Sequence, residues 1–377
     1  MSNSFCFDIV LPRDEICNQH EARDKIWAIV DAGQRLVLFG RRNTGKTSIV
    51  KSDIMERFAT KHERGLVVFV DLMDTASEAD FCVRLQRAFA VAISKSSSSR
   101  SIVNKVSQFM KQLKLSINID QVTGLPSVDL GIGSEQTPIA FERTLGLIAE
   151  IHQDHQALLI FDEFQDISFV KSLPAKIRSA LQLLPGDLPV LVLGSKKQLL
   201  SQMFADPRAP FASWGRHLEL PPISAEDYHE YIHTKFKSFG LSMSLDLTKF
   251  LLNEMQQIPE AINIVCDKMT KMQTTKSPID KNLIVQVIHL AVEERSSLFR
   301  ERLHRFTEKE IQFLRQIALD QPVAKPFAKI FVSATRLSVG GLQSMVSRLE
   351  NEAMIYRLEE GYVVNDPLLQ RFLARGL

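Results

Sequence analysis

Residues 40–47 read Gly-Arg-Arg-Asn-Thr-Gly-Lys-Thr, and they follow the apolar run Arg-Leu-Val-Leu-Phe at 35–39. Gly40 and Gly45 let the backbone adopt conformations that a side chain forbids, so that successive N–H groups can point at one phosphate. The helix expected to begin at Lys46 directs the positive end of its dipole at the same place. A strand before this pattern and an amphipathic helix after it predict a phosphate-binding P-loop at the end of a strand.

The residue types within the loop specify the ligand further. We expect Lys46 to contact the β- and γ-phosphates of ATP and to support catalysis, and the Thr47 hydroxyl to be a ligand of Mg²⁺. The predicted nucleotide-binding residues are the whole loop and the residue that follows it: Gly40, Arg41, Arg42, Asn43, Thr44, Gly45, Lys46, Thr47 and Ser48.

Short apolar runs alternate with helical patterns through the first half of the chain. This alternation predicts an α/β fold, in which a parallel sheet is covered by helices and its strands are buried on both faces. The predicted strands are 35–39, 65–72, 157–162 and 189–194.

An insertion of about 95–135 separates the second and third of these strands. A helix at 78–93 leads into a Ser-rich loop at 94–101, and 115–122 and 126–132 form a predicted hairpin with Thr-Gly at its turn. A basic stretch (Arg100, Lys105, Lys111 and Lys114) could contact phosphates, although a solvated helix face also accounts for it.

The run Leu-Leu-Ile-Phe-Asp-Glu at 158–163 is the second chemical signal. A carboxylate at the end of a buried strand costs free energy unless it serves a partner, and a bound cation is a common one. We therefore assign Asp162 to Mg²⁺. Glu163 is the predicted general base, which polarises the attacking water.

Two weaker signals follow further along the chain. Gly194-Ser195 ends the fourth strand, where Ser195 could sense the γ-phosphate or hold the water, or could simply belong to a strand-to-helix turn. Arg216, after Trp214-Gly215, could stabilise transition-state charge in its own subunit or in a neighbour's site, or could be a surface residue.

The character of the chain changes after Pro221-Pro222. Ser224-Ala-Glu-Asp predicts a capped helix start, and the pattern stays helical to about Phe306. Three helices and a strand pair then predict a winged helix. We expect a P-loop domain at 1–222, a helical lid at 223–305 and a winged-helix domain at 306–377.

Composition gives no global argument for nucleic acid or membrane. Of the 377 residues 45% are hydrophobic and 24% charged, the formal net charge is +2, and the four cysteines are widely spaced. No signal peptide or membrane span is evident, so we expect a cytoplasmic protein.

In order along the chain, these motifs resemble the archaeal-type ATPases of the STAND group within the AAA+-like P-loop NTPases. Leu-Pro-Arg-Asp-Glu at 11–15 matches that family's N-terminal motif with Pro12 in place of glycine, and Gln-Ile-Pro at 257–259 matches its lid motif with the proline but not the glycine. Asp-Pro-Leu at 366–368 is also similar to the family's C-terminal segment.

The resemblance implies a sheet of order 5-1-4-3-2 with the sensor strand between the two motif strands. It places Arg13 and Pro259 at the nucleotide. It implies a switch that hydrolyses ATP, assembles as an oligomer and controls a partner or effector protein.

Two alternatives stay open. The winged helix could bind DNA through Gln343, Ser344, Ser347 and Arg348, as in an initiator or transposition-type protein. Nearly balanced charge in 301–377, with Glu350 and Glu352 on the recognition helix, favours a module that docks on protein instead. A nucleotide-binding scaffold with negligible turnover is the other alternative, which the Asp162-Glu163 pair disfavours.

Overall fold

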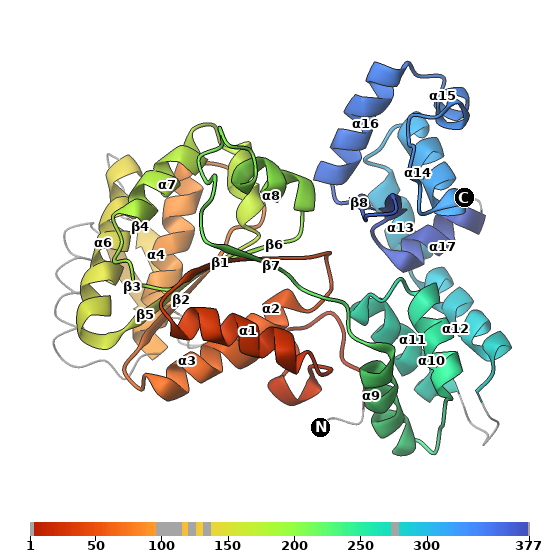
Figure 1. Ribbon diagram of the computed structural model, residues 1–377, viewed down its shortest axis with the longest axis horizontal. Helices are drawn as coiled ribbons and strands as arrows, with labels where there is room; N and C mark the ends of the chain where they lie inside the picture. Colours follow the sequence, from red (N-terminus) through yellow and green to blue (C-terminus); the bar gives the residue numbers. More distant parts are fainter. Residues whose placement is uncertain (1–3, 96–114, 120–125, 131–136, 273–278, 376–377) are drawn as a thin grey trace.

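The computed structural model describes residues 4–95, 115–119, 126–130, 137–272 and 279–375 (Figure 1). The predicted Ser-rich loop, the four basic residues of the insertion and the Thr-Gly turn lie outside these ranges, apart from the first residues of the loop. Within the described ranges, no helix is both long enough and apolar enough to cross a membrane.

A five-stranded parallel sheet is the centre of the first half of the chain. Its strands are β1 (Arg35–Phe39), β2 (Leu66–Asp71), β5 (Ala157–Asp162), β6 (Val190–Gly194) and β7 (Arg216–Glu219). They lie in the order β2-β5-β6-β1-β7 with parallel pairing throughout. Counting only these five along the chain and reading from β7, the order is 5-1-4-3-2, which confirms the predicted topology and places β6 between β1 and β5.

Both faces of this sheet are apolar, and each is covered by its own helices (Figure 1). On one face, alternate strand residues pack on α1 (His20–Asp31) and on the helix after the P-loop. The helices on the other face are α4 (Glu78–Lys95), α6 (Thr137–His155), α7 (Leu173–Gln182) and α8 (Lys197–Phe204). Burial on both faces explains why the strands read as continuous apolar runs.

We had predicted one regular α-helix after the P-loop, but the structure shows an interrupted helix. It consists of α2 (Lys46–Ile49), a π turn (Val50–Ile54) and α3 (Met55–Lys61). The π turn holds the buried Asp53, which accepts hydrogen bonds from Arg23 at 2.8 and 3.0 Å. Burial alone raises the pKa of Asp53, but Arg23 and Arg57 outweigh this effect and hold the pKa below its usual range.

The predicted insertion hairpin is present as the antiparallel pair β3 (Leu115–Ile119) and β4 (Pro126–Leu130). The lid consists of α9 (Ala225–Lys237), α10 (Leu245–Glu254), α11 (Pro259–Met272) and α12 (Lys281–Glu294), followed by α13 (Ser296–Leu303). The predicted cap is confirmed, because the Ser224 hydroxyl accepts a hydrogen bond from the Asp227 N–H.

The winged helix has the predicted three helices and strand pair. These are α14 (Glu308–Asp320), α15 (Lys329–Thr335), α16 (Val339–Asn351), β8 (Ile355–Arg357) and β9 (Tyr362–Val364). A further helix, α17 (Pro367–Arg375), which the sequence analysis did not predict, packs against α12 and α14. One apolar core runs continuously through the lid and the winged helix, so the division near residue 305 stays a prediction.

Candidate nucleotide-binding site

The P-loop connects the carboxyl end of β1 to α2. Gly45 has φ +92° and Asn43 has φ +61°, so the loop uses the left-handed conformation at its predicted glycine and at an asparagine that tolerates it. The Lys46 ammonium donates to the carbonyl oxygens of Gly40 at 2.9 Å and Arg41 at 2.6 Å. Lys46 is 6% exposed, and burial lowers its pKa to about 8 although Glu163 and Asp162 raise it. A buried cation held by neutral carbonyls suits an anionic ligand.

Thr47 and Asp162 lie together, as the metal prediction requires. The Thr47 hydroxyl donates to Asp162 Oδ2 at 2.8 Å, and burial raises the pKa of Asp162. Two hard oxygens at the end of a buried strand fit Mg²⁺, which usually keeps several waters and uses phosphate oxygens as further ligands. Among the described residues no group of three or more His, Cys, Asp and Glu could hold a metal ion alone. An ion at Thr47 and Asp162 would therefore depend on the phosphate.

Glu163 adopts a left-handed conformation with φ +49° at the turn after β5. Its Oε2 atom accepts hydrogen bonds from the Ser195 hydroxyl at 2.8 Å and from the Gln165 amide. The structure therefore brings Ser195 to the predicted general base. Gln165 was missed by the sequence analysis, because a glutamine two residues after an acid has no pattern of its own.

A cavity of about 450 Å³ lies over the P-loop and is of the size that small ligands occupy. Its walls come from the N-terminal segment 6–11, from the P-loop and α2, from Met73 and Glu163, and from Pro259, Glu260 and Asn263 of the lid. The residues Arg42, Asn43, Gly45, Lys46, Thr47 and Ser48 of the predicted set line it, and Gly40 and Thr44 line an adjoining cavity.

Arg13 does not line this cavity, and its contact with the nucleotide stays a prediction. Its guanidinium pairs with Asp53 at 2.8 Å, and Glu15 pairs with Lys235 of the lid in a fully buried contact. The backbone of Leu11 exchanges hydrogen bonds with Ser48 and Ser52. The N-terminal motif thus connects the P-loop helix to the lid.

Pro259 lies at the cavity where the family resemblance places it. Gln257, which stands where the family has glycine, nonetheless has a left-handed backbone with φ +55°. Gln256 is also left-handed, with φ +49°. The turn is therefore formed without glycine, although each such residue costs about 1 kcal/mol relative to glycine.

Arg216 is not brought to the site within its own chain. It begins β7 in register with Leu36, whereas the P-loop leaves the other end of β1 after Phe39. Because the strands are parallel, Arg216 lies toward the amino-terminal ends of the strands, whereas the P-loop lies at their carboxyl ends. Arg216 is also exposed. Action of Arg216 at a nucleotide stays a prediction, and its exposed position is compatible with the site of a neighbouring subunit and with a surface residue alike.

The side chain of Arg41 points away from the phosphate position and toward the winged helix. Its guanidinium donates to the backbone carbonyls of Asn365 at 2.9 Å and Val364 at 3.4 Å, and to Gln256 Oε1 at 2.9 Å. It also lies 5.5 Å from the ring centre of Tyr356. Arg41 is 8% exposed, and burial lowers its pKa to about 10. Its predicted role at the nucleotide is thus limited to its backbone.

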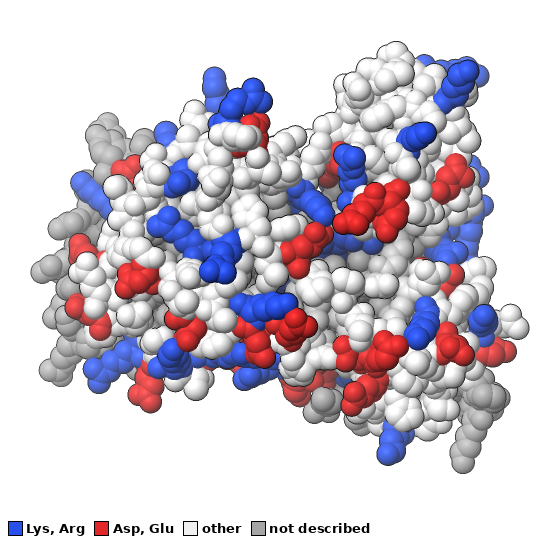
Figure 2. Space-filling view, in the orientation of Figure 1, with Lys and Arg blue, Asp and Glu red and all other residues white. Residues whose placement is uncertain are grey.

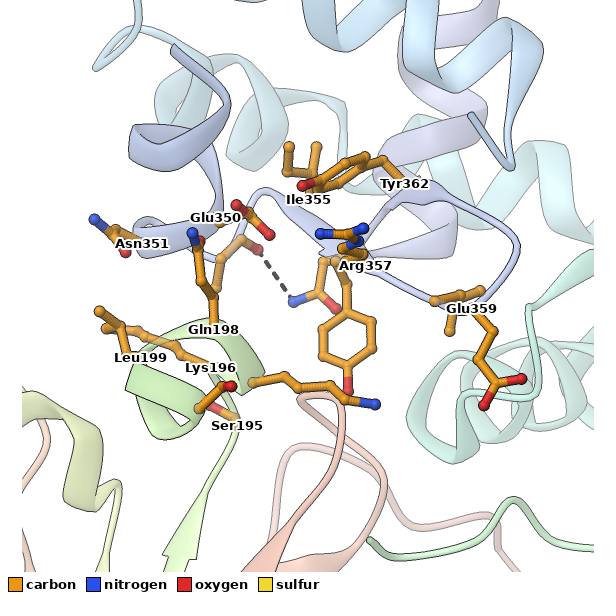
Figure 3. Close-up of a pocket in the computed structure, with 16 residues that line it drawn as sticks. Ser195, Lys196, Gln198, Leu199, Glu350, Asn351, Ile355, Arg357, Glu359 and Tyr362 are labelled. Atoms are coloured by element: carbon orange, nitrogen blue, oxygen red, sulfur yellow. Dashed lines mark hydrogen bonds between the residues drawn. The ribbon is translucent and has the colours of Figure 1, made fainter. Parts of the chain in front are cut away.

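Beside this contact, the winged helix faces the turn after β6 and the start of α8 across a cavity of about 300 Å³ (Figure 3). Ser195, Lys196 and Gln198 line one side, and Glu350, Asn351 and Arg357 lie across from them. The carboxyl-terminal end of α16 and the β8–β9 hairpin therefore meet the P-loop domain, while α15 lies at the far end of the winged helix (Figure 1).

These features define a P-loop ATPase fold with a C-terminal winged helix. Residues 297–375 match the family model described as "Probable winged helix domain". No curated protein matches the chain.

Solved structures share the fold over nearly the whole chain. A Walker-type ATPase of Pyrococcus abyssi superposes with a TM-score of 0.64 at 18% identity, covering 96% of this chain and 97% of the other. The ORC2 protein of Aeropyrum pernix follows at 0.58 and 11%, covering 98% and 95%. The ORC1 protein of the same organism, in complex with DNA, gives 0.51 and 10%, covering 100% and 98%.

Proposed function

We propose that the protein is an ATP-dependent switch of the STAND type, in which the state of the P-loop is transmitted to the winged helix. The observation that carries this proposal is the position of Arg41. Its backbone carbonyl accepts a hydrogen bond from Lys46, while its side chain holds the winged helix. A phosphate group that draws the Lys46 ammonium toward itself weakens the hydrogen bond to the Arg41 carbonyl, so nucleotide binding would act on the residue that holds the winged helix.

The proposed reaction is the hydrolysis of ATP. Water attacks the γ-phosphorus as the bond to the β–γ bridging oxygen breaks, and Glu163 accepts the proton of the water. Lys46 binds the phosphates and Ser195 holds the carboxylate of Glu163. Mg²⁺ at Thr47 and Asp162 would supply charge neutralisation of the phosphates.

We further propose that the chain acts in the cytoplasm, with domains at 1–222, 223–305 and 306–377. Release of the winged helix exposes the β8–β9 hairpin, which then becomes available to a partner protein or to a second copy of the chain. In such an assembly Arg216 would act in the site of a neighbouring subunit.

Replacing Arg41 with alanine tests whether this side chain connects the P-loop to the winged helix. We expect the winged helix to dock more weakly by about 1.5–3 kcal/mol, because removal of the guanidinium leaves the Gln256 and Asn365 oxygens of the lid and winged helix without their donor. The measurement is hydrogen–deuterium exchange of residues 351–366, which should speed up at least about tenfold without nucleotide. ATP affinity should change little, because the side chain points away from the phosphates.

Arg208→Ala is the matched control, since Arg208 is an exposed arginine of the same domain whose ion-pair partner among the described residues is Asp206. It should exchange like the wild type. Equal exchange of residues 351–366 in Arg41→Ala and the wild type would contradict the connection.

A second candidate function is duplex DNA binding, and the charge distribution of the winged helix now favours it. Between residues 321 and 349 the sequence has Lys325, Lys329, Arg336 and Arg348 and no acid. On the face seen in Figure 2, the area around α15 carries basic and no acidic side chains. Glu350 and Glu352, which we had counted against DNA, line cavities toward the rest of the chain.

Arg348, in contrast, is paired with Glu310 at 3.0 Å, so it is less available as a DNA contact than the sequence suggested. Lys325, Lys329 and Arg336 are exposed, and the structure gives none of them an ion pair within the described residues. They lie on or next to α15, at the end of the winged helix that is remote from the P-loop domain (Figure 1).

Charge reversal on this face tests the second candidate. In Lys329→Glu/Arg336→Glu we expect duplex affinity at low salt to fall at least about tenfold, and the salt dependence to lose about two phosphate contacts. Lys237→Glu/Lys249→Glu makes the same charge change on exposed lid residues and should bind nearly as the wild type. Equal losses in both pairs, or no binding by the wild type at low salt, would contradict DNA binding by this face.

A further inference from the structure

Gln165 lies in the 3₁₀ turn Phe164–Phe169, directly after the proposed general base, and is completely buried. Its amide nitrogen donates to Glu163 Oε2 and, at 3.3 Å, to Asp166 Oδ1. Asp166 is itself buried, and it accepts hydrogen bonds from Lys196 at 2.9 Å and from the backbone N–H of Asp74 at 2.9 Å.

This network determines which way the amide of Gln165 faces. Glu163 and Asp166 both present carboxylate oxygens, so the NH₂ group must point at them and the carbonyl oxygen must point away. The carbonyl oxygen faces Gly194, and no hydrogen-bond donor reaches it within the described chain. The hydrogen bonds that its amide nitrogen donates therefore determine the orientation of Gln165.

Gly194 provides the space that this orientation requires. A Cβ atom at position 194 would lie 2.5 Å from Gln165 Oε1 and 2.6 Å from Leu200 Cδ1, closer than real Cβ contacts allow. The next residue, Ser195, donates to the same Glu163 oxygen as Gln165 does. Gly194 and Ser195 at the end of β6 therefore both support Glu163. Gly194 leaves room for Gln165, and the Ser195 hydroxyl donates a hydrogen bond to the carboxylate.

The two donors hold one oxygen of Glu163 and leave the other available. Within the described residues Oε1 of Glu163 has no hydrogen-bond partner, and Glu163 lines the cavity over the P-loop together with Lys46 and Thr47. A carboxylate anchored through one oxygen presents the other at a defined place, which is what general-base catalysis needs.

We propose that Gln165 is a positioning residue, which acts through Glu163 and for which Gly194 makes room. The proposal rests on the proposed ATPase function. A purely structural role is the competing explanation, and it does not require both donors to meet the same oxygen of Glu163. Methionine would fill a similar volume, and Asp166 would keep its bonds to Lys196 and Asp74.

The experiment compares Gln165→Met with the wild type. We expect kcat for ATP to fall about 10- to 100-fold while the directly measured ATP dissociation constant changes less than about threefold and the melting temperature does not fall. Gln198→Met is the matched control, because Gln198 is a nearby half-buried glutamine that faces the winged helix, and its kcat should equal that of the wild type.

A double-mutant cycle separates positioning from packing. If Gln165 acts through Glu163, adding Gln165→Met to Glu163→Gln produces no further loss of the residual hydrolysis. Wild-type kcat in Gln165→Met, or additive losses in the cycle, would overturn the positioning role. Absence of ATP binding and turnover in the wild type itself would overturn the proposed function, and the positioning role with it.

Discussion

Lys46→Ala is expected to lose ATP binding by at least about 100-fold and to lose hydrolysis with it, corresponding to roughly 3 kcal/mol or more of binding free energy. Lys46 is the buried cation of the P-loop, and its only hydrogen-bond acceptors in the described chain are the carbonyls of Gly40 and Arg41. The free energy of burying this charge is recovered when a phosphate takes the place of those carbonyls. Titration calorimetry with ATP and Mg²⁺ measures the loss directly.

Lys197→Ala is the control for this measurement. Lys197 lies near the same edge of the sheet but is half-exposed and paired with Glu219 at 2.9 Å. Its replacement should leave ATP affinity within about twofold, as expected for a surface ion pair. If Lys46→Ala bound and hydrolysed ATP as well as the wild type, the assignment of residues 40–47 would be wrong.

Glu163→Gln is expected to lower turnover by about 10²–10⁴-fold while ATP binding is retained, because the amide cannot accept the proton of the attacking water. Glutamine keeps the size of the side chain, and its carbonyl oxygen can still accept from Ser195 and Gln165. Phosphate release under saturating ATP measures kcat, and a fluorescent nucleotide measures affinity.

Glu56→Gln, on the exposed side of α3, provides the matched charge change and should not alter turnover. Unchanged turnover in Glu163→Gln would contradict its role as general base, and ATP binding with negligible turnover in the wild type would favour the scaffold. In that case the pairing of Asp162 with Thr47 would serve nucleotide binding only.

The sequence predicted the parts of this molecule that depend on short stretches of chain. The buried strands follow from continuous apolar runs. The P-loop follows from glycines at fixed spacing, and the capped start of α9 follows from Ser224 and Asp227. The order of the strands came from the family resemblance, because local patterns do not determine which strands become neighbours.

The contacts that connect distant segments were not predictable in this way. Arg41 lies in a motif whose residues normally face phosphate, and its partners Val364 and Asn365 are more than 300 residues away. Arg13 was assigned to the nucleotide by resemblance, but the buried carboxylate of Asp53 attracts it instead. Arg216 was placed near the site by its order in the chain. Its register with Leu36 instead puts it toward the amino-terminal ends of the strands, away from the P-loop.

The net charge of the winged-helix segment was also a misleading guide to whether its surface could bind DNA. The winged-helix region is nearly balanced in charge, yet the segment around α15 carries bases and no acid. Glu350 and Glu352 line cavities toward the P-loop domain and the lid, although Glu352 is also exposed, and burial raises the pKa of Glu350 to about 7. Lys325, Lys329 and Arg336 face solvent. Only the folded arrangement separates the two sets.

The central claim is that nucleotide at the P-loop releases the winged helix through Arg41. The most direct test is the distance between spin labels at Leu183→Cys and Lys329→Cys, two exposed positions on the P-loop domain and the winged helix, in a Cys6→Ser background. With Glu163→Gln to prevent turnover, ATP and Mg²⁺ should shift the distance distribution, and Lys46→Ala should remove the shift. Arg41→Ala should show the shifted distribution without nucleotide. An unchanged distribution in a protein that demonstrably binds ATP would contradict the claim.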